Sequence, residues 1–223
     1  LISISIPHGE KLFAQVWVAH VGRVPLLLLD SDVESNDSTR RGVTDRLYGG
    51  GVEDRLTQEL LLGVGGVRAL RAYTRIAKAP APNVFHTNEG HAGFLGIERM
   101  RELIQGHEGL NFAQALEATR ASTVFTTHTP VSAGIDRFPA ELIRNCFTGE
   151  GSISHMPVDS IMALGLEPNG EFFNMAMMGF ALAGRANGVS LLHGEVSRDM
   201  FSNLWPGFDN SDIPITSITN GVH

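Results

Sequence analysis

The chain has 223 residues, of which 43% are hydrophobic, and its net charge at pH 7 is −7. This amount of apolar material supports a folded core and excludes a mainly disordered chain. The acidic balance and the scattered basic residues argue against a general binder of nucleic acids or anionic membranes. The longest apolar stretch, residues 172–184, is shorter than the roughly 20 residues of a membrane-spanning helix.

Other features of the sequence bear on the compartment. The single cysteine, Cys146, cannot form a disulfide within the chain, which fits a reducing compartment. The first residues carry neither the basic segment nor the cleavage pattern of a secretory signal. We therefore expect a cytoplasmic protein. The chain starts at Leu1 without a methionine and stops abruptly at His223, so we expect a piece of a longer protein.

The first predicted elements are strands. Alternation of isoleucine with serine over residues 2–6 predicts a half-buried strand, and residues 12–17 form a second extended run after a turn at 8–10. Residues 25–30 contain four consecutive leucines, which predicts a strand buried on both faces of a parallel sheet.

The next segment, residues 31–48, has no periodicity and is predicted to be a loop. A helix is predicted to begin near Glu53 and to turn three leucines inward: Leu56, Leu60 and Leu61.

Strands and helices then alternate along the chain. Helices are predicted at 91–104, 111–122, 140–147, 158–164 and 174–184, and strands at 83–87, 122–127, 189–193 and 214–218. This alternation predicts an α/β fold, with a Rossmann-like, mostly parallel sheet and helices on both faces. Residues 148–154 are predicted to be a flexible insert within one domain that covers residues 1–223.

Polar side chains follow the predicted strands. In open α/β sheets, ligands bind beyond the carboxyl ends of the strands. Here those positions are residues 86–91, 127–130, 193–195 and 219–223, and they are rich in His, Asn, Thr and Glu. A cleft with this lining suits a neutral polyhydroxyl ligand better than a charged or an apolar one.

The same residues allow other interpretations. Residues 86–91 place Glu89 between His86 and His91, yet they lack the i, i+4 histidine spacing of zinc proteases and have no cysteine nearby. A purely structural loop is an alternative. His128 follows a predicted strand, and its position favours a functional role over a structural one.

The two glycine clusters do not indicate a phosphate loop. Residues 49–51 precede the acidic Glu53 and Asp54, which would repel a phosphate, so a turn is favoured. Residues 63–66 lie inside a helical run, which favours close helix packing. Glu89 and Glu195 are the only carboxylates at predicted strand ends with polar neighbours, and no catalytic triad can be built.

At these loops the sequence resembles the α-glucan (glycogen, starch and maltodextrin) phosphorylases, particularly the bacterial branch typical of actinobacteria. The matching stretches include HTNEGHAGFL at 86–95 and TVFTTHTPVSAG at 123–134. Five further stretches match in the order of the family: residues 48–70, 174–176, 186–190, 192–197 and 219–221.

The resemblance implies a fold and a reaction. Members of this family are two-domain GT-B glycosyltransferases, and the chain is expected to be an incomplete N-terminal, glucan-side domain. They transfer the terminal glucosyl unit of an α-1,4-glucan to inorganic phosphate and give α-glucose 1-phosphate with retention. Pyridoxal phosphate is their cofactor; its lysine is expected in the C-terminal domain, which this chain lacks.

The resemblance also implies roles for individual residues. His128 and Asn220 are expected to be catalytic and to bond the glucosyl unit around its 6-hydroxyl. Four further residues are expected to bind substrate: Glu89, His91, Asn88 and Thr129. Asn187 and Glu195 match family stretches in supporting roles. No cofactor-binding or metal-binding residue is expected in this chain.

Differences from the family limit what is carried over. The glycine-rich active-site loop is expected upstream of Leu1, and the short segment 49–51 argues against nucleotide control of the animal type. The chain alone is therefore expected to be inactive and the parent protein active, with a homo-oligomer as a candidate assembly of the parent. A nucleotide-sugar-dependent glucan synthase and a non-catalytic glucan-binding domain are the alternatives.

Overall fold

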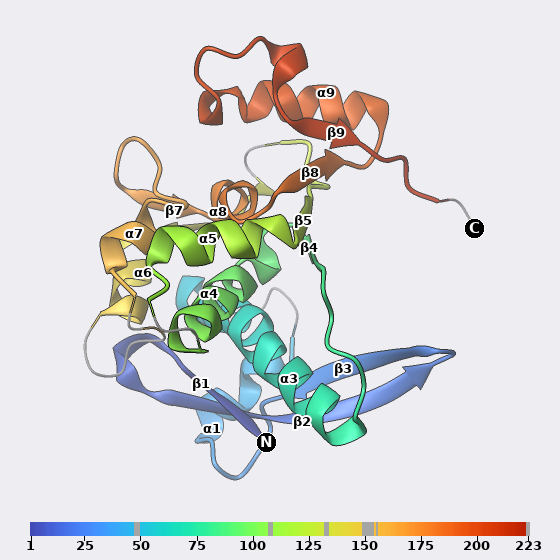
Figure 1. The fold of residues 1–223 in the computed structure, drawn as a ribbon. Coiled ribbons are helices and arrows are strands. Elements are labelled where there is room, and N and C mark those ends of the chain that lie inside the picture. The colour runs from blue at the N-terminus through green and yellow to red at the C-terminus, as the bar shows by residue number, and fades with distance from the viewer. Residues whose placement is uncertain (47–49, 107–108, 132–133, 149–153, 155, 222–223) are drawn as a thin grey trace.

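The computed structural model describes residues 1–46, 50–106, 109–131, 134–148, 154 and 156–221. A three-stranded antiparallel sheet forms the N-terminal part, and a four-stranded parallel sheet forms the centre of the rest (Figure 1). A short two-stranded sheet accompanies the parallel one. Within the described ranges, no helix combines the length and the apolar character needed to cross a bilayer.

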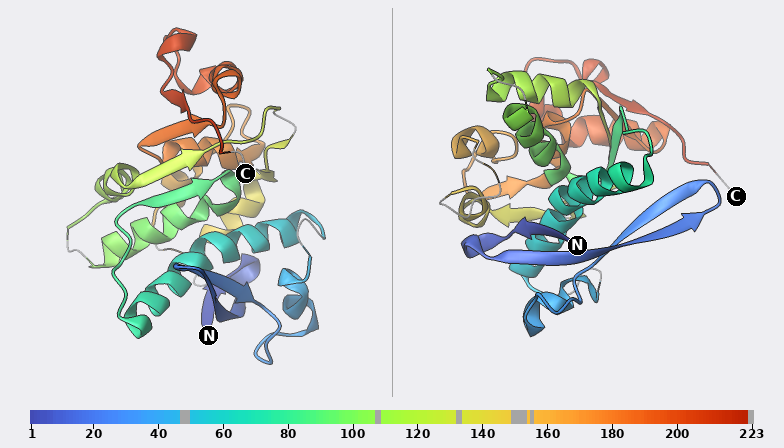
Figure 2. Two further views of the ribbon diagram at one scale, coloured as in Figure 1. Left: turned by 90° about the vertical axis from the view of Figure 1, so that its right-hand side faces the viewer. Right: turned by 60° about the horizontal axis from the view of Figure 1, so that its bottom comes forward.

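The antiparallel sheet has the strand order β1-β2-β3, with β1 (Ile2–Ser5), β2 (Lys11–Val21) and β3 (Val24–Asp30). The predicted strands at 2–6 and 12–17 are therefore confirmed. The strand predicted at 25–30 is confirmed as β3, but its assignment to a parallel sheet was wrong, because β3 pairs antiparallel with β2 in a long hairpin (Figure 2, right). Its leucines alternate in exposure: Leu27 and Leu29 pack against the core, while Leu26 and Leu28 are 48% and 47% exposed.

The segment after β3 is more ordered than the predicted loop. It contains α1 (Ser38–Arg41), which Asp37 caps by accepting a hydrogen bond from the backbone N–H of Arg40. A continuous helical run follows and consists of α2 (Val52–Leu60), a π-helical segment η3 (Leu61–Gly65) and α3 (Gly66–Ala77). Leu56, Leu60 and Leu61 are buried, as predicted. The predicted turn at 49–51 and the insert at 148–154 lie partly outside the described residues.

The parallel sheet has the order β4-β5-β8-β9. Its strands are β4 (Phe85–Asn88), β5 (Thr123–Thr126), β8 (Arg185–Gly188) and β9 (Ile215–Ser217). The helices α4 (Phe94–Gly106) and α5 (Phe112–Ala121) connect β4 to β5, and α9 (Leu191–Met200) connects β8 to β9. The strands predicted at 83–87, 122–127 and 214–218 are confirmed.

The strand predicted at 189–193 was wrong. Those residues begin α9, because Ser190 caps this helix by accepting a hydrogen bond from the backbone N–H of His193 at 3.1 Å. The apolar pair that suggested a strand, Leu191 and Leu192, is 76% and 70% exposed on the first turn. Glu195 therefore lies on an exposed part of α9 and not at the end of a strand.

Between β5 and β8 the chain forms a helical layer and a small sheet. The elements are β6 (Arg137–Pro139), α6 (Ala140–Phe147), α7 (Val158–Met162), β7 (Phe172–Asn174) and α8 (Met175–Ala181). The three helices confirm the predictions, whereas the antiparallel pair β6–β7 was not predicted. Asn174 caps α8, since its side chain accepts hydrogen bonds from the backbone N–H groups of Ala176 and Met177.

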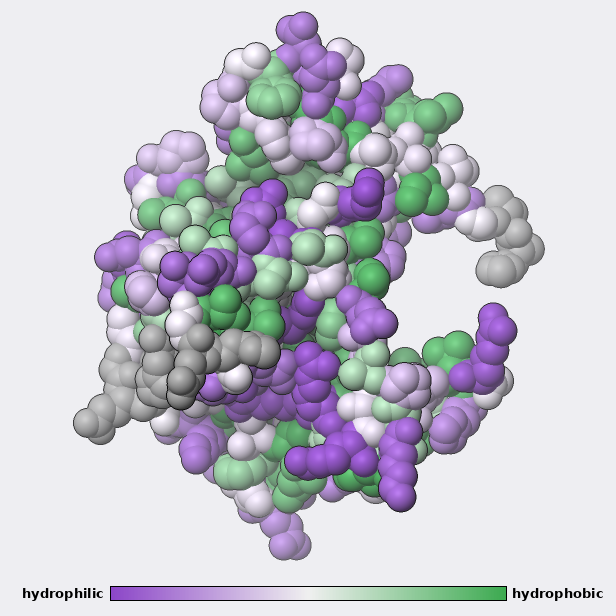
Figure 3. All heavy atoms as spheres, in the orientation of Figure 1, coloured by the Kyte–Doolittle hydropathy of each residue, from purple (hydrophilic) through white to green (hydrophobic). Residues whose placement is uncertain are grey.

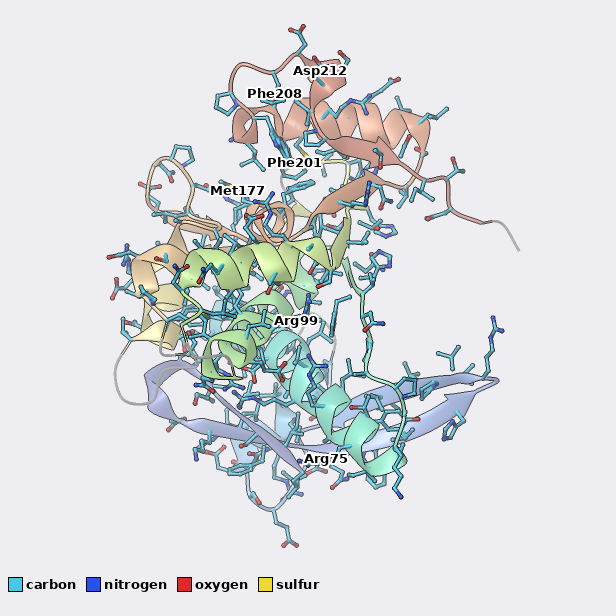
Figure 4. All side chains as sticks on the ribbon, in the orientation of Figure 1. Arg75, Arg99, Met177, Phe201, Phe208 and Asp212 are labelled. Atoms are coloured by element: carbon cyan, nitrogen blue, oxygen red, sulfur yellow. The ribbon has the colours of Figure 1, made fainter. Side chains whose placement is uncertain are left out.

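The helices that connect the parallel strands pack on one face of the sheet. On that face, Phe125 of β5 contacts Phe180 of α8 with ring centroids 4.8 Å apart. Arg99 of α4, labelled in Figure 4, lies 4.0 Å from the ring centroid of Phe85 and donates to Thr123. A Cβ on Gly188 would lie 2.8 Å from the His193 ring of α9, so this helix also packs on that side.

The opposite face of the sheet is open, with His86, Arg185 and Thr216 exposed. The expectation of helices on both faces is therefore not met within the described residues. The cause is the strand order. The four strands follow one another across the sheet in their chain order. Right-handed crossovers between them therefore place every connecting helix on the same side. The left view of Figure 2 looks onto this open face, and Figure 3 shows a hollow beside it, between the segment after β9 and the β2–β3 hairpin.

Candidate functional site

The carboxyl ends of the parallel strands bring together several of the polar residues that were singled out in the sequence. Because β4 and β5 are neighbours, the Asn88–Glu89 segment lies beside the segment 127–129. The side chains of Asn88 and His128 are exposed, and Thr129 is half-buried. Asn220 lies beyond β9, two strands from β5 at the same edge, and its backbone N–H donates to Val189 at 3.2 Å.

Glu89 connects the two neighbouring strand ends. Its Oε1 accepts hydrogen bonds from the backbone N–H groups of both His128 and Thr129, the latter at 2.6 Å. Its own backbone N–H donates to the carbonyl of Thr126 at 2.9 Å. The Glu89 carboxylate is thus engaged with the main chain of the neighbouring loop.

The backbone of Glu89 has φ = 61° and ψ = −176°, a region populated almost only by glycine. Such a conformation costs about 1–3 kcal/mol and persists where the surrounding structure fixes it. The next residue is fixed tightly, because a Cβ on Gly90 would lie 2.6 Å from the Cβ of Met175. The strained residue is therefore located between a strand end and a closely packed turn.

A second hydrogen-bond chain crosses the strands just before their ends. The side-chain Nδ2 of Asn187 donates to the carbonyl of Gly188, and this bond turns Oδ1 of Asn187 toward Thr126. The hydroxyl of Thr126 donates its one hydrogen to Oδ1 of Asn187 at 3.0 Å. The same hydroxyl therefore accepts from Nε2 of His86 at 2.7 Å. His86 and Asn187 are thus linked through the Thr126 hydroxyl, and Asn187 holds the strands together from a buried position.

His91 lies off the sheet edge, on the short 3₁₀ segment η4 (Gly90–Ala92). It faces Arg55 and Glu59 of α2 and Asp136 from the segment before β6. Its Nδ1 donates to Asp136 Oδ2 at 2.9 Å and lies 3.5 Å from Glu59 Oε1. Arg55 donates to the same Asp136 oxygen at 2.8 Å. We call these four residues the Arg55 cluster.

Burial and hydrogen bonds shift the pKa values of three side chains in the Arg55 cluster. Burial raises the pKa of Glu59 to about 7. Hydrogen bonds to Asp136 and then to Glu59 raise the pKa of His91 to about 9. Burial alone would raise the pKa of Asp136, but hydrogen bonds from His91 and Arg55 bring it well below its ordinary value. At neutral pH, Asp136 is therefore ionised between two cations, and Glu59 is close to its midpoint.

The Arg55 cluster contains three residues that could ligate a metal, since single ligand atoms of Glu59, His91 and Asp136 lie within 4.8 Å of one another. The guanidinium of Arg55 already supplies a cation there, with Nη2 2.8 Å from Asp136 and 3.7 Å from Glu59. Sequence reasoning did not find Arg55, Glu59 or Asp136. The i, i+4 spacing of the first two on a helix is a signal that could have indicated them.

The residues of this chain do not fit pyridoxal phosphate. A cofactor bound as a Schiff base needs a lysine. The sequence contains two, Lys11 and Lys78, and both are exposed, on β2 and at the end of α3. Neither lies at the carboxyl edge of the parallel sheet, so no step through the cofactor can be assigned to this chain.

Comparisons with known proteins agree with the family resemblance. No protein-family model matches the chain. Glycogen phosphorylase of Mycobacterium tuberculosis is 58% identical over 229 aligned residues, which cover 100% of this chain and 26% of that protein. Maltodextrin phosphorylase of Thermococcus litoralis is 39% identical over 99% of this chain and 25% of its own length. Glycogen phosphorylase of Aquifex aeolicus is 34% identical over 96% of this chain and 30% of its own length.

The chain thus spans about a quarter of the length of these relatives. The similarity extends over the antiparallel sheet, the Arg55 cluster and all strands of the parallel sheet. Over its whole length, the chain is homologous to one part of the glycogen and maltodextrin phosphorylases.

Proposed function

We propose that this chain is the glucan-side part of an α-1,4-glucan phosphorylase. The parent enzyme transfers the terminal glucosyl unit of glycogen or maltodextrin to inorganic phosphate and releases α-glucose 1-phosphate with retention. The observation that carries this proposal is the identity of 58% over the full chain to a protein named glycogen phosphorylase.

Within this proposal, the carboxyl edge of the parallel sheet binds the glucosyl unit. The exposed side chains of His128 and Asn220 bond the sugar hydroxyls as its configuration changes, and Asn88 and Thr129 border it. Hydrogen bonds of this kind accelerate the reaction when they are stronger in the transition state than in the ground state. Glu89 and His91 complete the pocket from the β4 side.

The proposal also concerns architecture. Parallel sheets in proteins have both faces covered, and the face with His86, Arg185 and Thr216 is open. This supports an incomplete N-terminal domain of a GT-B enzyme, with other parts of a longer polypeptide covering the open face. Pyridoxal phosphate belongs to that longer protein and supplies a phosphate group as acid and base. The parent is cytoplasmic and acts on glucan and phosphate, and this assignment is the same for a monomer and for a homo-oligomer.

The test is phosphate-dependent release of glucose 1-phosphate from glycogen by the full-length parent, with and without pyridoxal phosphate. Release that needs both supports the proposal. The matched arm replaces phosphate with a nucleotide sugar and measures glucan extension. Extension without phosphorolysis would overturn the assignment in favour of a synthase of the same fold. The 223-residue chain alone is expected to show no phosphorolysis, and turnover above background would contradict its role as one half of a site.

A further inference from the structure

The Glu89 carboxylate directs one oxygen at two successive main-chain donors. Oε1 accepts from the N–H groups of His128 and Thr129, and the bond from Thr129 is 2.6 Å long. Bonds to an ionised acceptor are shorter and stronger than bonds between neutral groups. Oε1 of Glu89 therefore fixes the main chain of His128, whose side chain is exposed beyond the end of β5.

The backbone of Glu89 is itself fixed from both sides. The N–H of Glu89 is bonded to Thr126, and Gly90 packs against the backbone and side chain of Met175. Its positive φ is a conformation that a glutamate adopts only when the surroundings require it. The carboxylate is thus presented to the neighbouring loop by a rigid support.

The same short segment also holds the other end of that loop. His91, two residues after Glu89, donates to Asp136 at 2.9 Å, and the carbonyl of Asp136 accepts from the N–H of Met175 at 3.0 Å. Residues 89–91 therefore contact the loop after β5 near its beginning and at its end. We call this arrangement the 89–91 clasp.

We propose that Glu89 is a positioning residue: its carboxylate holds the main chain of His128 and Thr129, and it affects catalysis only through that loop. This rests on the proposed function and deepens it, because the resemblance alone makes Glu89 a substrate ligand. The two roles predict different results when Glu89→Ala is combined with His128→Ala.

A double-mutant cycle in the full-length parent separates them. Glu89→Ala is expected to lower kcat by about 10–100-fold, as for a misplaced catalytic group, with the KM for glucan changed less than about threefold. His128→Ala with Glu89→Ala is expected to be no slower than His128→Ala alone. A further loss of tenfold or more in the double variant would overturn the proposal, because Glu89 would then act independently of His128.

The matched control is Glu117→Ala, which removes a carboxylate 71% exposed on α5 and is expected to leave kcat unchanged. Glu89→Gln is the second variant, since it keeps the size of the side chain and one acceptor oxygen. It is expected to recover part of the activity lost in Glu89→Ala. A Gln variant as slow as the Ala variant, with KM raised instead, would indicate lost substrate contact and contradict the proposal.

A readout without turnover keeps this test separate from the proposed function. Amide hydrogen exchange at residues 128 and 129 is expected to be at least tenfold faster in Glu89→Ala than in the wild-type parent, while exchange in β5 stays unchanged. Unchanged exchange at both amides would overturn the clasp. An inactive wild-type parent with protected amides would instead refute the phosphorylase assignment and leave the clasp intact.

Discussion

Gly63 lies against the main chain of Leu95. A Cβ on Gly63 would be 2.7 Å from the backbone nitrogen of Leu95 and 2.8 Å from the Cβ of Phe94. The helical run α2–η3–α3 thus meets the start of α4 without an intervening side chain, as the glycine-rich sequence predicted. This contact supports the turn that carries Glu89 and His91, since α4 follows that turn directly.

We expect Gly63→Ala to destabilise the fold by about 1–3 kcal/mol, because backbone atoms cannot move aside for the added methyl group. Gly66→Ala is the matched control: nothing lies within 4 Å of its added Cβ, and Gly66 is helical. It is expected to stabilise the fold by about 0.5–1 kcal/mol. Urea unfolding of both variants measures the difference, and equal midpoints would contradict the close contact.

Glu59→Gln is expected to change how stability depends on pH. The pKa of Glu59 rises from 4.5 to about 7 on folding, so its contribution to stability is present below pH 4.5 and is lost as pH rises through 7. Relative to the Gln variant, the wild type should lose about 2–3 kcal/mol between pH 5 and pH 8. Denaturant titrations at the two pH values test this.

His91 titrates in both proteins. Its pKa is raised to about 9, so its contribution is lost as pH rises from 6.5 through 9, and the Gln variant should retain that later decline. Parallel stability curves for wild type and Glu59→Gln from pH 5 to pH 8 would show that Glu59 is ionised throughout this range.

The backbone of Glu89 gives a prediction about glycine. Glu89→Gly is expected to be more stable than Glu89→Ala by about 1–2 kcal/mol, because both lose the carboxylate and glycine alone relieves the positive φ. On α5 the order should reverse, with Glu117→Gly less stable than Glu117→Ala by about 1 kcal/mol. Thermal unfolding of the four variants tests both comparisons. The same order at both positions would argue against strain at residue 89.

His128→Ala in the full-length parent is expected to lower kcat/KM for phosphorolysis by about 10–1000-fold, equivalent to roughly 1–4 kcal/mol of lost hydrogen bonding to the sugar. His20→Ala removes another exposed histidine, on β2, and should leave the rate unchanged. Steady-state kinetics with glycogen and phosphate give the comparison. A His128→Ala variant with wild-type kinetics would remove His128 from the site.

Local patterns predicted most of the elements around the site. The β-branched run at 122–127 and the strand at 83–87 form β5 and β4. The polar residues that follow these two strands lie side by side, because the strands are parallel neighbours. The catalytic roles of these polar residues remain proposals. The contact of Arg55 with Asp136 was beyond local patterns, since the two residues are 81 positions apart and meet only after the helices pack.

The wrong predictions also have physical causes. Consecutive leucines in β3 suggested burial on two faces, but the pleat directs alternate side chains outward and leaves Leu26 exposed. The run 189–193 is apolar enough for a strand, yet the cap at Ser190 starts a helix there. The side on which helices pack depends on strand order, and hydrophobic patterns carry no information about order.

The strand order β4-β5-β8-β9 is also the order in which a ribosome makes these strands. Each later strand of this sheet pairs with the strand of the same sheet that was synthesised before it, so none must be inserted between two partners that have already joined. A nascent chain can therefore extend this sheet one unit at a time. Glu89 is made before Thr126 and Met175, which fix its strained backbone, so the clasp can form only after these later segments have been synthesised.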